Sequence, residues 1–287
     1  MFMGLVGSEM CIRDRFGRAN NAKTSYKRLA SFMEETQDDD VEEKNQTAIR
    51  REKLGGLQFK DTTYRYPEAD LDTLRGINLV INEGEKVAIL GRNGSGKSTL
   101  MKLASGLFKA SDGLVMYDGV DIRQLHTDDL SRSVGIVLQD VQLFSGSVRE
   151  NITMGRKDIS QDDLVEAGKL SGLDEFISKI PGGYDLQLSD GGKGLSGGQR
   201  QSIALARAIV HRPSHFILDE PTSAMDMNAE NLFIHQVGSI LQNSTMLIVT
   251  HRMPLLNLVD RIIVMNEGQI VEDGPKDEII KKLNQNP

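Results

Sequence analysis

The sequence predicts an α/β fold with a mainly parallel central sheet, an antiparallel β layer and an inserted helical subdomain. Four short, continuous apolar runs indicate parallel strands, because strands that are buried on both faces do not alternate with polar residues. These runs lie at 87–90, 134–138, 215–218 and 246–249. Alternating patterns predict the antiparallel layer, and a long stretch without strand patterns predicts the helical subdomain.

The antiparallel layer is expected before and just after the first parallel strand. Apolar and polar residues alternate at 57–60 and 64–66, and a third strand pattern follows at 77–81. Asp118 and Gly119 are typical of a tight turn between two paired strands. The chain therefore predicts hairpins in addition to the parallel sheet.

The helical subdomain is expected within residues 140–200. Between Gln139 and Ser196 no strand pattern matches the four apolar runs in strength. Residues 161–170 and 173–180 instead have helical patterns. We expect this segment to interrupt the order of the parallel strands as one inserted unit.

A glycine-rich segment follows the first apolar run and precedes a helical pattern. Residues 91–99 fit the phosphate-binding pattern G-x-x-x-x-G-K-[ST]. In such a loop the backbone amides surround phosphate, Lys97 reaches the outer phosphates and Ser98 can bind magnesium. A glycine-rich turn without nucleotide is the alternative, which the flanking strand and helix patterns disfavour. The ATP-binding residues predicted here are Gly91, Asn93, Gly94, Ser95, Gly96, Lys97, Ser98 and Thr99.

Polar residues follow the other three apolar runs, at the sheet edge where ligands bind parallel α/β folds. Asp219 is expected to help bind magnesium, and Glu220 to polarise the water that attacks ATP. His251 is expected to contact the terminal phosphate, and the amide of Gln139 to meet magnesium and that water. Alone, each residue is equally compatible with an ordinary strand exit. The predicted catalytic residues are Glu220, His251, Gln139 and Lys97, and the predicted magnesium ligands are Ser98, Gln139 and Asp219.

A second phosphate motif lies far from the first. Residues 195–199 read Leu-Ser-Gly-Gly-Gln and open a helical pattern that continues to Ala208. The serine hydroxyl and the glycine amides would form the positive end of that helix. A simple helix cap is the alternative. The phosphate-binding residues predicted here are Ser196, Gly197, Gly198 and Gln199.

From about residue 57 to the C-terminus these motifs, in this order, resemble the nucleotide-binding domain of an ABC transporter. The resemblance implies a P-loop NTPase (RecA-like) core that binds ATP and Mg²⁺. It implies that Tyr66 stacks on adenine, although packing in an edge strand is the alternative. It also implies that Asp226, in the D-loop, and the signature at Ser196 meet ATP bound by a second copy, arranged head to tail.

Within this family, several segments of the sequence are most similar to those of exporters, and especially to those of type I secretion ATPases. Residues 139–152 are similar to the segment of exporters that faces the membrane domain, and residues 250–253 and 273–277 are similar to type I secretion ATPases. The resemblance implies transport across the inner membrane, with the ATPase on its cytoplasmic face. The implied partners are the transporter's own membrane-spanning domain, an adaptor protein and an outer-membrane channel.

Composition agrees with a cytosolic ATPase. The chain has 287 residues, of which 39% are hydrophobic, so it is long enough to bury a substantial core. Its 34 basic and 41 acidic residues give a net charge of −7, which argues against nucleic acid as the main partner. The single cysteine, Cys11, excludes an internal disulfide and is typical of a reducing compartment.

Four segments are expected along the chain. Residues 1–15 resemble a translated sequencing adaptor more than a signal peptide, so we expect a non-native or disordered segment. Residues 16–36 resemble the cytosolic end of an exporter's last membrane helix, with an amphipathic helix packed on the domain as the alternative. Residues 37–53 are expected to form an acidic linker, and 54–287 the ATP-binding domain.

Three other functions stay open. The chain could belong to an exporter of lipids, peptides or drugs, since the cargo is chosen by parts absent from this sequence. It could be a soluble ABC ATPase that remodels chromosomes or ribosomes, although it has neither a second cassette nor a long coiled coil. It could also be a nucleotide sensor that dimerises on ATP without useful turnover.

Overall fold

The computed structural model describes residues 48–67, 69–223, 225–241 and 244–285. The segments expected at 1–15 and 16–36, and the linker up to residue 47, lie outside these ranges. Within the described ranges, no helix has both the length and the apolar character that a bilayer crossing requires.

The larger sheet has six strands in the order β12-β11-β3-β10-β9-β6. Its strands are β3 (Lys86–Gly91), β6 (Val134–Val137), β9 (His215–Asp219), β10 (Thr245–Val249), β11 (Arg261–Asn266) and β12 (Gln269–Pro275). All neighbours in this sheet pair in parallel except β11 and β12, which are antiparallel. The four apolar runs are thus confirmed as strands of a mainly parallel sheet.

Alternate side chains of the parallel strands enter two different hydrophobic clusters. In β10, Leu247 and Val249 point to the cluster that contains α3 (Lys97–Ala104), whereas Met246 and Ile248 point to the cluster on the other face. The same division holds in β3, β9 and β11. Because both faces are covered, both sets must be apolar, which explains why these strands appear as uninterrupted hydrophobic runs.

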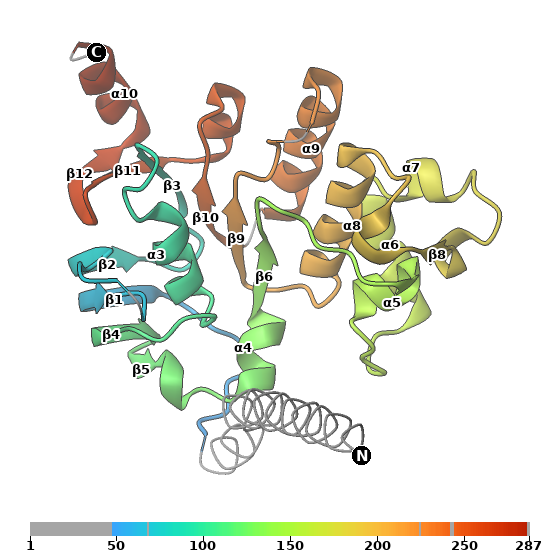
Figure 1. Cartoon of the computed structure of the whole chain (residues 1–287), viewed down its shortest axis with the longest axis horizontal. Helices are drawn as coiled ribbons and strands as arrows, with labels where there is room; N and C mark the ends of the chain where they lie inside the picture. The colour runs from blue at the N-terminus through green and yellow to red at the C-terminus, as the bar shows by residue number, and fades with distance from the viewer. Residues whose placement is uncertain (1–47, 68, 224, 242–243, 286–287) are drawn as a thin grey trace, which may run out of the picture. The chain divides into compact units, whose positions relative to one another are not determined.

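The antiparallel layer has the strand order β2-β1-β4-β5 and lies beside α3 (Figure 1). Its strands are β1 (Leu57–Tyr64), β2 (Leu74–Ile81), β4 (Asp112–Tyr117) and β5 (Val120–Asp121). Asp118 and Gly119 join β4 to β5 with φ angles of 50° and 74°, so both adopt the left-handed conformation that a tight hairpin needs. The predicted layer and its turn are confirmed.

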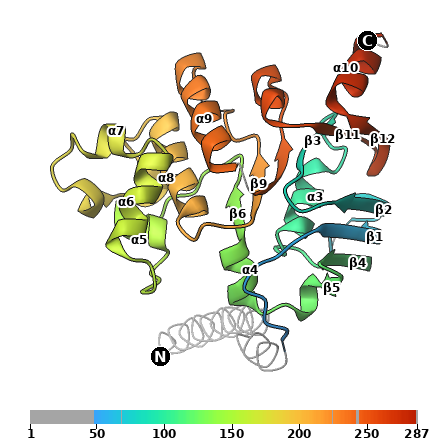
Figure 2. The same ribbon diagram turned by 180° about the vertical axis from the view of Figure 1, so that it is seen from behind.

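The segment between β6 and β9 is mainly helical. Its helices are α5 (Val148–Thr153), α6 (Gln161–Leu170), α7 (Asp174–Ile177) and α8 (Gly197–Ile209), with 3₁₀ turns η2 (Gly183–Asp185) and η3 (Asp190–Gly192). Helices α5, α6 and α7 lie together beside α8 (Figure 2). One detail was not expected: β7 (Gly146–Ser147) pairs with β8 (Gln187–Leu188), a pairing too short to leave a strand pattern in the sequence.

Three further helices lie in the part of the chain that the structure describes. They are α4 (Thr127–Ser133), α9 (Met227–Ile240) and α10 (Lys276–Gln285), with 3₁₀ turns η1 (Ile122–Gln124) and η5 (Met253–Leu258). Phe233 of α9 and Ile279 of α10 join the same hydrophobic cluster as the buried face of α8. The helices on this face therefore share one core with the sheet.

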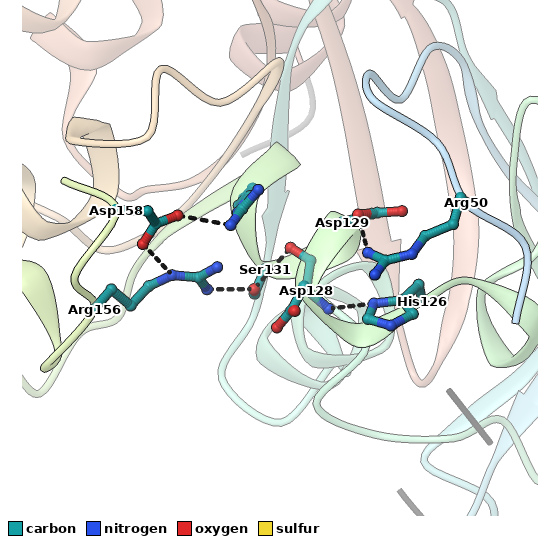
Figure 3. A network of polar contacts seen from close by, with 8 residues as sticks. Arg50, His126, Asp128, Asp129, Ser131, Arg156 and Asp158 are labelled. Carbon is teal, nitrogen blue, oxygen red and sulfur yellow. Dashed lines mark hydrogen bonds and ion pairs between the residues drawn. The ribbon is translucent and has the colours of Figure 1, made fainter. Parts of the chain in front are cut away.

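Helix α4 connects two distant parts of the chain through polar contacts (Figure 3). At its start, Asp129 accepts hydrogen bonds from the Arg50 guanidinium at 2.8 Å and from the Arg51 backbone amide at 2.9 Å. At its end, Arg132 pairs with Asp158 at 2.6 Å, and Ser131 accepts a hydrogen bond from Arg156. The segment that leads into β1 and the connection between α5 and α6 are thus held by one helix.

His215 is a buried titratable group at the first position of β9. Its side chain is 2% exposed, and its ring packs edge-on against Tyr117 with 4.9 Å between ring centroids. Nδ1 lies 3.0 Å from the Ser214 hydroxyl, and Nε2 has no hydrogen-bond partner among the described residues. Burial lowers the pKa of His215 from 6.5 to about 4.

This histidine should make folding stability depend on pH. The folded state keeps His215 neutral, whereas the unfolded chain binds a proton below its pKa of about 6.5. The stability that neutral His215 contributes to the folded state is therefore complete above pH 6.5 and is lost as pH falls towards 4. The free energy of unfolding should change by about 3 kcal/mol across this range. Denaturant unfolding of His215→Gln should show a weaker pH dependence across this window. Exposed His235→Gln is the control for the removal of one imidazole, and the prediction is contradicted if it weakens the pH dependence as much as His215→Gln does.

Candidate active site

A cavity of about 630 Å³ lies where β3, β6, β9 and β10 end. The sequence-predicted residues that line it are Tyr66, Asn93, Gly94, Gly96, Lys97, Ser98, Thr99, Gln139, Asp219, Glu220 and His251. The parallel register explains the gathering, because Val249 of β10 is level with Ile89 of β3 and Asp219 of β9. Residues that follow these strands must therefore meet at one edge of the sheet.

The loop between β3 and α3 is shaped by glycines that no other residue could replace without strain. Gly91 and Gly96 have φ angles of 153° and 99°. A Cβ on Gly91 would lie 2.3 Å from the carbonyl oxygen of Met265, and one on Gly96 would lie 2.6 Å from Leu74 Cδ2. Gly91 and Ser95 do not line the cavity. They hold the loop in shape, with Ser95 accepting a hydrogen bond from the Gly268 amide.

The N-terminus of α3 opens towards this cavity. Gly96 is the N-cap residue and no side chain caps the helix, so its first amides remain available to an anion. Lys97 is only 7% exposed, and its ammonium donates to the carbonyl oxygens of Gly91 and Arg92, both at 2.9 Å. Burial lowers the pKa of Lys97, and the carboxylates of Glu220 and Asp219 oppose that shift. The loop therefore concentrates positive charge where a phosphate would enter.

Two carboxylates face this positive charge. Asp219 ends β9 and Glu220 follows it with a φ of 47°, its amide bonded to the Val249 carbonyl. Asp219 Oδ1 and Glu220 Oε1 are buried and have no hydrogen-bond partner among the described residues. His251 Nε2 approaches Glu220 Oε1 at 3.4 Å, which is an electrostatic contact rather than a hydrogen bond. Burial, reinforced by Asp219, raises the pKa of Glu220, while His251 and Lys97 oppose the rise.

Tyr66 lines the cavity and comes from the antiparallel layer, just after β1. It is half-buried, and its hydroxyl lies 3.2 Å from Thr99 Oγ1. Its ring packs edge-on against Tyr64 at 5.1 Å and against Phe108 at 5.8 Å. Tyr66 lies two residues beyond the end of β1, and it takes part in packing, as the alternative for this residue expected. The aromatic cluster holds the ring at the cavity wall.

The second phosphate motif does not join this cavity. Ser196 is the N-cap of α8, where its hydroxyl accepts from the Gln199 amide at 3.2 Å and the Gln199 side chain accepts from the Ser196 amide at 2.8 Å. Ser196, Gly198 and Gln199 line a separate cavity of about 210 Å³, together with Met225. Within the described part of the chain the Ser196 hydroxyl only accepts, so its proton is available to a phosphate oxygen. Asp226 caps α9 by accepting from the Ala229 amide at 2.9 Å.

Sequence reasoning missed several residues at the site. Thr73, Ser223 and Val249 also line the larger cavity. Ser223 could have been found, because it lies within the motif that follows Glu220. Thr73 could not, since it directly precedes β2 and belongs to none of the motifs.

These features define the chain's class: a P-loop nucleotide-binding domain, with a phosphate loop, an acidic pair and a histidine around one cavity. The description "ABC transporter" matches residues 74–223. That match covers more than half of the chain, and the chain belongs to the ABC transporter family. It is the ATP-binding domain of that family, and the predicted P-loop fold with its inserted helices is confirmed.

The most informative relatives are export proteins of bacteria. The chain is 43% identical over 227 residues to the leukotoxin export ATP-binding protein LtxB of Aggregatibacter actinomycetemcomitans, covering 79% of this chain and 32% of that protein. It is 42% identical over 226 residues to the cyclolysin secretion/processing ATP-binding protein CyaB of Bordetella pertussis, again covering 79% and 32%. The chain thus spans about a third of the length of these relatives.

A solved structure agrees with this placement. A bacterial Atm1-family ABC exporter with ATP bound is similar at a TM-score of 0.74 and 30% sequence identity. The similarity covers 82% of this chain and 41% of that structure. The fold described above is therefore that of an exporter's ATP-binding domain.

Proposed function

We propose that this chain is the ATP-binding and ATP-hydrolysing part of an ABC exporter that works as a head-to-tail dimer. One observation carries the proposal: a single copy gathers the phosphate loop, the acidic pair and His251 in one cavity, whereas Ser196 and its neighbours line another. Each ATP would contact Lys97 and Ser98 of one copy. It would also contact Ser196, Gly197 and Gly198 of the second copy, with Asp226 nearby.

Each residue then has a role that its geometry allows. Glu220, whose buried Oε1 has no hydrogen-bond partner within the described ranges, would orient the attacking water and accept its proton. His251 and Lys97 would stabilise negative charge on the terminal phosphate. The amide of Gln139 would contact the same water, and Tyr66 would stack on the adenine ring.

The side chains at the cavity are also suitable ligands for a magnesium ion that binds together with ATP. Among the described residues, no group of three His, Cys, Asp or Glu side chains could hold a metal alone. Magnesium in such sites binds one or two carboxylates together with phosphate oxygens and water. The unpartnered Asp219 Oδ1 meets that need, and Ser98, Gln139 and Asp219 would hold the ion. Bound Mg²⁺ would supply positive charge that neutralises the phosphates.

The relatives' names support type I protein secretion as the process. They describe ATP-binding proteins of leukotoxin and cyclolysin export. The whole transporter would then include a membrane-spanning domain, an adaptor protein and an outer-membrane channel, with this domain at the cytoplasmic face of the inner membrane. Residues 16–36 would be the end of the last membrane helix, and 54–287 the domain that hydrolyses ATP.

A mixing experiment tests the shared site. In a mixed head-to-tail dimer, the phosphate loop disabled by Lys97→Ala in one copy faces the signature of the other copy, where Gly198→Glu repels phosphate, so both substitutions fall at the same site. Each variant alone damages both sites, but a mixed dimer keeps one site fully intact. Phosphate release by an equal mixture should recover to about a quarter of the wild-type rate, whereas each variant alone stays inactive.

Gly198→Glu should fold normally. The nearest atom to an added Cβ is Ala229 Cβ at 3.7 Å, and an acid in the first turn of α8 suits the helix dipole. Gln161 is exposed in the first turn of α6, so Gln161→Glu is the matched control and should keep full activity alone. A mixture as inactive as its components, with wild type active, would contradict the shared site.

A further inference from the structure

Glu230 is a buried carboxylate outside the ATP cavity. It lies on α9 and is 5% exposed. Both of its oxygens are engaged: Oε1 accepts from the Thr222 hydroxyl at 2.8 Å, and Oε2 accepts from the Arg252 guanidinium at 3.0 Å. A carboxylate this deep requires such partners, because burial without them is costly.

The two partners of Glu230 belong to the two segments that carry the proposed chemistry. Thr222 lies two residues after Glu220, and Arg252 directly follows His251. The Arg252 backbone amide is further fixed by the Thr250 hydroxyl at 3.0 Å. The buried side chain of Glu230 therefore joins the segment that follows β9 to the segment that follows β10.

Arg252 also reaches the loop between Glu220 and α9. Its second guanidinium nitrogen lies 3.5 Å from the Ser223 carbonyl oxygen and 3.4 Å from that of Met225. Ser223 lines the ATP cavity, and Met225 lines the separate cavity of the Ser196 motif. The Arg252 guanidinium thus connects the segment of His251 to two loop residues, one at each cavity.

We propose that Glu230 and Arg252 are positioning residues for ATP hydrolysis. Their ion pair holds His251 together with Thr222, Ser223 and Met225, so that His251 meets the terminal phosphate only when these residues have the correct position for the second site. This inference rests on the proposed ATPase function and its shared sites. It assigns this role to an ion pair between buried Glu230 and half-buried Arg252, neither of which lines the cavity at the phosphate loop.

Measuring kcat and ATP affinity for conservative variants of the two residues tests this inference. Glu230→Gln keeps the side-chain volume and the Thr222 contact but removes the charge, and Arg252→Met removes the guanidinium. Each should lower kcat about ten- to a hundredfold, the scale of small misplacements of reacting groups. The dissociation constant of a fluorescent ATP analogue should stay within about twofold of wild type, since the phosphate loop is untouched.

The double variant and a control separate positioning from simple structural support. If the pair acts as a unit, Glu230→Gln combined with Arg252→Met should be no slower than either single variant. Glu85→Gln breaks a 2.8 Å ion pair with Arg261 far from the cavity and should leave kcat unchanged. If Glu230→Gln fails to fold, Arg252→Lys provides the test, because it keeps the charge but loses the fork that reaches two carbonyls.

The outcomes distinguish this inference from the proposed function. If wild type does not hydrolyse ATP, or Lys97→Ala is fully active, the proposed function is wrong. If wild type is active and depends on Lys97 while the Glu230 and Arg252 variants keep the wild-type kcat, only the positioning role is wrong. Additive losses in the double variant, or parallel losses of ATP affinity and kcat, would likewise overturn it.

Discussion

Glu220→Gln should hydrolyse ATP at least about a hundredfold more slowly than wild type, while it binds ATP as tightly. Glutamine keeps the shape of the side chain but cannot accept the proton of the attacking water. Burial raises the pKa of Glu220, which makes its carboxylate a stronger base than an exposed glutamate. Single-turnover phosphate release, together with equilibrium binding of ATP, measures both halves of this expectation.

The chain offers a matched control for this substitution. Glu267 is exposed and has the same φ of 47° as Glu220, but it lies in the turn between β11 and β12 and does not line the cavity. Glu267→Gln should hydrolyse ATP at the wild-type rate. If Glu220→Gln did the same, the assignment of Glu220 as the base would be wrong.

Lys97→Ala should abolish tight ATP binding, with an increase in Kd of about ten- to a hundredfold for the loss of a charged hydrogen bond. The substitution also removes the two 2.9 Å bonds from the ammonium to the Gly91 and Arg92 carbonyls. The phosphate loop then loses both its charge and part of its support. Isothermal titration with ATP and magnesium provides the measurement.

Lys60→Ala is the control for this loss of charge. Lys60 is exposed on β1 and does not line the cavity, so its removal changes net charge equally but should leave Kd unchanged. Tight ATP binding by Lys97→Ala would mean that the loop amides alone hold the phosphates, and that the proposed role of Lys97 is wrong.

The parallel strands could be predicted because burial on both faces leaves an apolar signal in every residue. β12 could not: its residues alternate between exposed and half-buried, as expected of an edge strand. β11 has an apolar run, but its position beside β3 depends on which strands pair, which sequence alone does not encode. The pairing of β7 with β8 is likewise set by neighbours rather than by its own residues.

At the site, motif spacing predicted which residues lie close together, but it did not predict which of them line the cavity and which only shape the loop or cap a helix. Gly91 and Ser95 shape the loop without facing the cavity, and Asp226 caps a helix. The ion pair of Glu230 with Arg252 joins residues 22 positions apart on different elements, so nothing local marks it. Contacts of this kind follow from tertiary packing and become visible only in the folded chain.

The polar contacts of α4 have a mechanical consequence. The helix has seven residues and a length of about 10 Å, with Arg50 and Arg51 fastened to one end and Asp158 to the other. The backbone at Arg50 and Arg51 is therefore joined to the connection between α5 and α6 through one short helix. None of the residues in these contacts lines the cavity at the phosphate loop, so this connection does not run through that site.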